Sequence, residues 1–130
     1  MTDKLLTSGL EDYLECIFNN IEEHGSVKAI QISKELNVSR ASVTDALHRL
    51  TAKEYINYAR YGVISMTPKG KDKAIEVIGK HKVLTLFFET VLNLSSEEAS
   101  ENACRIEHVI TENAFSRLKE YTQSIIEGKQ

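Results

Sequence analysis

Apolar residues recur at helical spacing through the first part of the chain. Between residues 8 and 23 they lie three and four positions apart, which predicts an amphipathic helix. A capping box of Ser8 and Glu11 marks its expected start. Shorter apolar patterns over residues 27–36 and 39–54 predict a second and a third helix, with a tight turn between them. The expected core of this part contains Ile30, Ile32, Leu36, Val43, Leu47 and Leu50.

The pattern changes over residues 55–67, where β-branched and aromatic residues surround Gly62. This composition predicts a short β-hairpin. Thr67 followed by proline is typical of a helix start, and a long helix is expected to run on to about residue 92. The rest of the chain, residues 95–127, predicts further helices.

This order of elements predicts a mainly α protein with a small β-hairpin wing. Helix, helix, turn, helix and hairpin follow one another in a winged helix-turn-helix DNA-binding domain, which we expect over residues 1–71. Residues 72–130 are then expected to form an all-α domain. Helix-turn-helix topology also occurs in domains that never touch DNA, so the order alone leaves that alternative open.

Composition narrows the class of protein. The chain has 130 residues, of which 42% are hydrophobic and 27% charged, as expected for a globular protein. Two cysteines are too few for a disulfide scaffold. No apolar run is long enough for a membrane span, and the first residues have no apolar signal core, so we expect a cytoplasmic protein without a membrane partner. A net charge of −3 neither favours nor excludes a nucleic-acid partner.

The third predicted helix carries the side chains suited to reading DNA. Small hydroxyl and methyl groups on its N-terminal half allow a close approach to base edges, and basic residues reach phosphates or guanine. Any one of these charges, taken alone, is more simply a solvated surface residue. Two copies are expected to bind one two-fold site, because a monomer this weakly basic would bind DNA poorly. The predicted DNA-binding residues are Lys28, Ser39, Arg40, Ala41, Ser42, Thr44, Asp45, Arg49 and Arg60.

Potential metal ligands recur on three separate predicted helices. In the run ENACRIEHVIT, residues 101–111, helical spacing places a thiol, a carboxylate and an imidazole on one face, opposite an apolar face. Two carboxylates share a face of the first helix, and one histidine lies on the long helix. Each has a simpler explanation as a solvated face or a core histidine. The candidates are Asp12, Glu15, His81, Cys104, Glu107 and His108.

If these groups converge, a cation is expected among them. Three carboxylates and a thiolate held close together repel one another strongly. A divalent metal would cancel that repulsion and tie the first helix to the C-terminal half of the chain.

Several stretches occur in the order typical of one known family. They are EDYLECIF, SVTDALHRL, YARYGVISMTPKG, KHKVLTLFFETVL and ACRIEHVIT. Together they resemble the diphtheria-toxin-repressor-like family of metal-activated transcription repressors, and its shorter manganese transport regulators in particular. The likeness extends from about residue 8 to about residue 121. It implies a homodimer that binds double-stranded operator DNA, in which a metal between the winged helix and an all-α dimerisation domain activates binding.

The resemblance also assigns the metal ligands one by one. Asp12 and Glu15 match the first-helix acids of the manganese regulators, His81 matches their fourth-helix histidine, and Glu107 and His108 match their Glu-His pair. Cys104 instead resembles the iron-sensing members. Those members use Glu and His in an ancillary site where this chain has Thr85 and Ser100.

The identity of the metal follows from this mixed ligand set. Carboxylates and imidazoles favour Mn²⁺ or Fe²⁺, whereas the thiolate favours Fe²⁺, Co²⁺ or Zn²⁺. We expect Mn²⁺, with Fe²⁺ as the alternative and Co²⁺ or Zn²⁺ binding in vitro. Cys16 is interpreted as a bystander.

Two other functions remain open at this point. One is a winged-helix regulator that responds to a small organic ligand. The other is a small metallohydrolase, since carboxylates, histidines and a metal also hydrolyse esters. The sequence contains no phosphate-binding loop and no nucleophile elbow, so we expect that the protein is not an enzyme.

Overall fold

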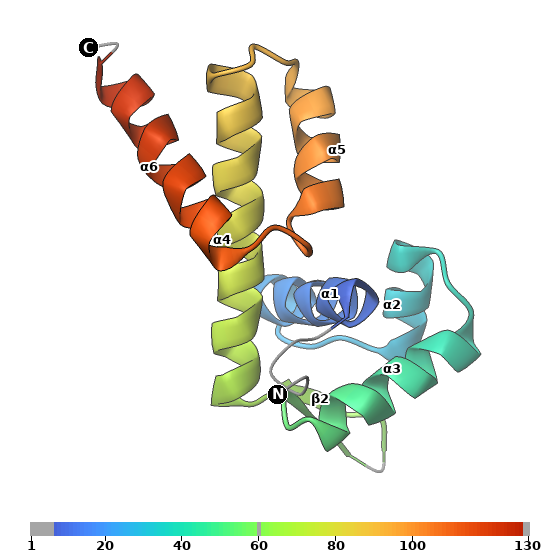
Figure 1. The fold of residues 1–130 in the computed structure, drawn as a ribbon. Coiled ribbons are helices and arrows are strands. Elements are labelled where there is room, and N and C mark those ends of the chain that lie inside the picture. The colour runs from blue at the N-terminus through green and yellow to red at the C-terminus, as the bar shows by residue number, and fades with distance from the viewer. Residues whose placement is uncertain (1–6, 60, 129–130) are drawn as a thin grey trace. The chain divides into compact units, whose positions relative to one another are not determined.

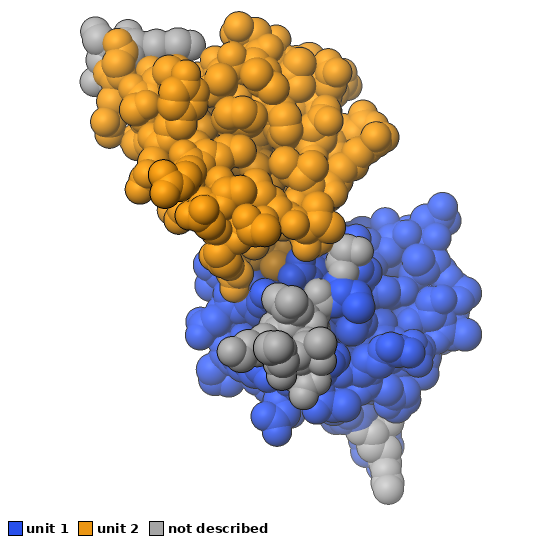
Figure 2. All heavy atoms as spheres, viewed as in Figure 1, with its two compact units in different colours: residues 1–75 blue, residues 76–130 orange. Residues whose placement is uncertain are grey.

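A computed structural model of the protein describes residues 7–59 and 61–128, and these contain six helices and one two-stranded sheet (Figure 1). The chain divides between Ile75 and Glu76 into two compact units, coloured separately in Figure 2. None of the helices in the described residues combines the length and apolar character that a bilayer span needs.

The first unit has the predicted helix, helix, turn, helix and hairpin. Helices α1 and α3 pack against α2 and against each other, and α3 also packs against the first strand. The fold is therefore mainly α with a small hairpin, as predicted. Its elements are α1 (Ser8–His24), α2 (Ala29–Leu36), α3 (Arg40–Ala52), β1 (Ile56–Tyr58), β2 (Ile64–Met66) and the first residues of α4, a helix whose full range is Pro68–Thr90.

Side-chain caps and left-handed residues fix the helix ends. Asn37 adopts a φ of 56° at the end of α2, which turns the chain sharply into α3. At the start of α3, Ser39 Oγ accepts a hydrogen bond from the Ser42 amide at 3.0 Å, as predicted. The predicted cap of α1 is wrong by one residue. Thr7, not Ser8, is the N-cap, and its hydroxyl accepts from the Leu10 amide at 3.2 Å.

The hairpin is short and tightly turned. Strands β1 and β2 are antiparallel, with Asn57 opposite Ser65. Gly62 has a φ of 83°, a left-handed conformation that favours glycine, and the Ala59 amide donates to the Val63 carbonyl at 2.8 Å. This turn produces the predicted wing.

The core of the first unit lies among α1, α2, α3 and the hairpin. Leu14, Ile17 and Ile32 are fully buried there, with Leu47 and Leu50 from α3. Replacing one such leucine by alanine typically costs about 2–5 kcal/mol, so this core holds α3 firmly in place. The expectation that Ile30 belongs to the core is wrong, because its side chain is 43% exposed.

The second unit is all-α. It consists of residues 76–90 of α4 together with α5 (Ser96–Ile106) and α6 (Glu112–Gly128). Helices α4 and α5 run in opposite directions side by side, joined by a short turn (Figure 1). Leu84 of α4 and Ala99 and Ala103 of α5 are fully buried.

The predicted helix over residues 101–111 ends early. Helix α5 stops at Ile106, and Glu107 is its C-cap. The predicted apolar face does not continue beyond this point, since Val109 is 73% exposed. His108 therefore lies in the turn after the helix, where its side chain is not restricted to a helical face.

Candidate metal centre and nucleic-acid interface

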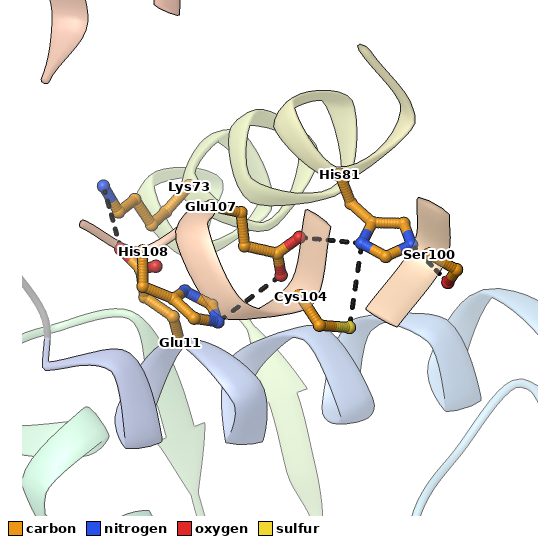
Figure 3. A network of polar contacts seen from close by, with 7 residues as sticks. All are labelled: Glu11, Lys73, His81, Ser100, Cys104, Glu107 and His108. Carbon is orange, nitrogen blue, oxygen red and sulfur yellow. Dashed lines mark hydrogen bonds and ion pairs between the residues drawn. The ribbon is translucent and has the colours of Figure 1, made fainter. Parts of the chain in front are cut away.

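Glu107 and His81 are in close contact in the candidate metal centre. His81 projects from α4, and Glu107 lies at the end of α5 (Figure 3). Nδ1 of the imidazole and Oε1 of the carboxylate are 2.7 Å apart. The Glu107 side chain is only 2% exposed, whereas that of His81 is 26% exposed. A buried carboxylate needs such a partner, because it has lost the water that would solvate its charge.

Cys104 adds a sulfur ligand to this pair. It lies on α5 one turn before Glu107, and its Sγ is 3.9 Å from His81 Nδ1. One ligand atom from each of His81, Cys104 and Glu107 lies within 4.8 Å of the other two. Imidazole nitrogen, thiolate sulfur and carboxylate oxygen are all common ligands of divalent transition metals. The chemistry of this donor set therefore fits a metal ion.

His108 contacts the other oxygen of the same carboxylate. Its Nε2 is 3.4 Å from Glu107 Oε2, and the side chains are 7% and 2% exposed (Figure 3). The Glu107 carboxylate thus lies between two imidazole rings. Four of the six predicted ligands, His81, Cys104, Glu107 and His108, are brought together within the second unit.

The remaining two predicted ligands belong to the first unit. Asp12 and Glu15 lie one turn apart on α1, and Asp12 is exposed while Glu15 is half-buried. Their participation in metal binding stays a prediction.

Two polar contacts beside the candidate ligands, one in each unit, were not expected from the sequence. Ser100 Oγ lies 3.3 Å from His81 Nε2 (Figure 3). In the sequence, Ser100 stood out only by its spacing of four residues before Cys104 and by its place at an ancillary-site position of the iron-sensing members. Within the first unit, Lys73 of α4 contacts Glu11 of α1 at 3.6 Å. The sequence alone predicts only a helix-capping role for Glu11.

Cys16 lies in a different environment from Cys104. Its side chain is 3% exposed, and burial, with the neighbouring Glu35 carboxylate, raises the pKa of the thiol to about 12. The Asn20 amide donates to the Cys16 carbonyl at 2.8 Å and to Glu35 at 3.1 Å. A thiol held in its protonated form is a poor metal ligand.

The predicted DNA-reading residues lie on the exposed side of the helix-turn-helix. Ser39, Arg40, Ala41, Ser42 and Thr44 occupy the start of α3 and are all exposed. The opposite side of the helix supplies the core residues Val43 and Leu47. The arrangement leaves the small side chains accessible to base edges.

Asp45 and Arg49 are bound to each other on the same exposed surface. Arg49 Nε donates to Asp45 Oδ2 at 2.8 Å, and both side chains are more than 60% exposed. Such an exposed pair contributes about 1 kcal/mol at most, so Arg49 remains available for a phosphate. Lys28 is exposed at the start of α2, and Arg60 lies outside the described residues.

The chain matches the two domains of one known family in sequence. Residues 5–64 match the model described as iron dependent repressor, N-terminal DNA binding domain. Residues 67–126 match the model described as iron dependent repressor, metal binding and dimerisation domain.

Curated relatives show the same similarity over nearly their whole length. An HTH-type transcriptional regulator of Methanocaldococcus jannaschii is 35% identical over 88% of this chain and 92% of its own. The HTH-type transcriptional regulator MntR of Geobacillus thermodenitrificans is 31% identical over 95% of this chain and 87% of its own.

Solved structures extend the likeness to three dimensions. The crystal structure of IdeR from T. acidophilum superposes with a TM-score of 0.74 at 30% identity. The match covers 85% of this chain and 52% of the IdeR chain, so this chain spans about half the length of that relative.

Proposed function

Because this chain belongs to the iron-dependent repressor family, whose members are metal-dependent transcriptional regulators and not enzymes, we propose that it represses transcription in response to a divalent metal. The first unit would bind operator DNA, and the second would bind the metal and pair with a second copy. Such a protein works in the cytoplasm, where its DNA and a reduced Cys104 are found together.

The observation that carries this proposal is the cluster around Glu107. A buried carboxylate lies between two imidazoles, and a thiol lies next to one of them. A bound divalent ion would supply positive charge to this cluster and balance the negative charge of the buried carboxylate. His81, Cys104, Glu107 and His108 would hold it.

The metal is proposed to be Mn²⁺, with Fe²⁺ as the alternative. Carboxylate and imidazole ligands suit both ions, and a relative 31% identical to this chain is named as the regulator MntR. The Cys104 thiolate favours Fe²⁺, and it would also bind Co²⁺ or Zn²⁺ in vitro. Affinity alone ranks these ions in the Irving–Williams order, so selection in the cell depends on geometry and availability.

We further propose that Asp12 and Glu15 complete the set of ligands. A metal bound by side chains of both units would restrict α1, and α1 packs on the DNA-reading helix α3. In a homodimer this would fix the spacing of the two α3 helices for successive major grooves. The metal and the operator would then strengthen each other's binding, because such coupling is reciprocal.

The residue assignment is tested by removing Glu107 and His108. Glu107→Ala and His108→Ala should each weaken Mn²⁺ binding at least about tenfold, because each removes a ligand from a small set. Competition against a fluorescent chelator measures the affinity, and circular dichroism of the metal-free protein checks that the fold is kept. Glu107→Gln repeats the test with a side chain of the same shape.

Glu101→Ala is the matched control for this test. Glu101 lies on α5 as well, but its side chain is 61% exposed and bound to Arg105 at 2.7 Å. It should bind Mn²⁺ like the unaltered protein. If Glu107→Ala and His108→Ala do so too, the site assignment is wrong. If the unaltered protein binds neither Mn²⁺ nor Fe²⁺, the metal-sensing function itself is wrong.

A further inference from the structure

The imidazole ring of His81 has a hydrogen-bonding partner on each of its nitrogens. Nδ1 lies toward Glu107 Oε1 at 2.7 Å and Cys104 Sγ at 3.9 Å, so it belongs to the candidate metal centre. Nε2 points to the other side of the ring, where Ser100 Oγ lies at 3.3 Å (Figure 3). The ring orientation is therefore fixed from both sides.

A metal at Nδ1 dictates where the His81 proton must be. A neutral imidazole has one N–H and one lone pair, and a metal bound to the ring would need the lone pair. With Nδ1 as the ligand atom, the proton must sit on Nε2. Ser100 Oγ is the atom that lies in position to accept it.

Without a metal, the proton is expected on the other nitrogen. A carboxylate has no hydrogen to donate, so the 2.7 Å contact with Glu107 requires the proton on Nδ1. A neutral ring then has its lone pair on Nε2, and the hydroxyl of Ser100 donates to it. A hydroxyl serves in both states because its hydrogen rotates, whereas a carboxylate only accepts and an ammonium only donates.

We propose that Ser100 is a positioning residue for the metal: it holds the orientation of the His81 ring and accepts the Nε2 proton that binding at Nδ1 requires, which favours the metal-bound state. This inference rests on the proposed metal-binding function. Metal-bound histidines usually need such a partner on the second nitrogen, and losing it typically costs 10–100-fold in affinity.

The nearest alternative hydroxyl on α4 does not have this role. Thr85 lies one turn beyond His81, but its buried hydroxyl has no hydrogen-bond partner among the described residues. Ser100 and Cys104 are one turn apart on α5, and both contact the same ring. Helix α5 thus places one group on each nitrogen of His81.

The affinity test compares Ser100→Ala with Ser100→Thr. Ser100→Ala should weaken Mn²⁺ and Zn²⁺ binding by about 10–100-fold, and Ser100→Thr, which keeps the hydroxyl, should stay within about threefold of the unaltered protein. Ser96→Ala removes an exposed serine from the same helix and should change nothing. Thermal unfolding of each metal-free variant separates a loss of affinity from a loss of fold.

The proton placement is tested by long-range ¹H–¹⁵N NMR of the histidine rings at mildly alkaline pH. In the metal-free protein the His81 proton should be on Nδ1, and after Zn²⁺ addition it should be on Nε2. A proton on Nε2 in both states, or a folded Ser100→Ala that binds Mn²⁺ normally, would overturn the inference. Those results leave the metal-sensing function intact, whereas an unaltered protein that binds no metal would refute both.

Discussion

Two side chains of the same type, Cys16 and Cys104, have opposite chemical properties here. Cys104 is exposed and contacts His81, while Cys16 is buried beside Glu35 with its pKa raised to about 12. The thiolate is the form that binds metals and reacts with electrophiles. Only Cys104 is therefore placed to act as a ligand.

Thiol labelling measures this difference directly. In native, metal-free protein, one of the two thiols should react quickly with a thiol reagent, and the second should react only after unfolding. Raising the pH toward 9.0, the ordinary pKa of a thiol, should not release Cys16, because its own pKa is about 12. Cys104→Ser should remove the fast reaction, and Mn²⁺ should slow it. Two fast thiols in the native protein would contradict the assignment.

At the scale of elements, most of the fold was predictable because it follows from local patterns. The stripe of α1, the caps at Ser39 and Thr67 and the turn at Gly62 each act within a few residues. The end of α5 at Ile106 was not predictable, because the pattern of residues 101–111 stays helical while the chain turns. Nor was the Ser100 contact, since it depends on how α4 and α5 pack.

Two glycines of α4 test how closely this helix packs against the segment that precedes β1. A methyl group on Gly70 would overlap the backbone carbonyl of Tyr55, whereas one on Gly79 would meet no atom within 4 Å. Gly70→Ala should therefore lower the free energy of unfolding by about 2 kcal/mol or more. Gly79→Ala, the matched control, should raise it by about 0.5–1 kcal/mol, because alanine favours the helix. Urea denaturation measures both, and a neutral Gly70→Ala would contradict the close contact.

In the whole molecule, the proposed function requires that metal binding and DNA binding are coupled. The predicted DNA-reading residues belong to the first unit, and the cluster of His81, Cys104 and His108 around Glu107 belongs to the second. The functions proposed for the two units follow from the family, whose two domains are described as DNA-binding and as metal-binding and dimerisation domains. The motifs in the sequence were enough to predict this family. The metal was predicted as Mn²⁺ with Fe²⁺ as the alternative, because the predicted ligand Asp12 favours a hard ion and Cys104 a softer one.

The proposed function is tested most directly by measuring DNA binding with and without metal. A labelled duplex, selected from a random pool in the presence of Mn²⁺, would be titrated at fixed salt with Mn²⁺, with Fe²⁺ or with a chelator, and binding followed by fluorescence anisotropy. The account predicts at least about tenfold tighter binding with metal, a coupling of about 1.4 kcal/mol or more, and its loss in Glu107→Ala. Equal affinity with metal and with chelator would contradict it.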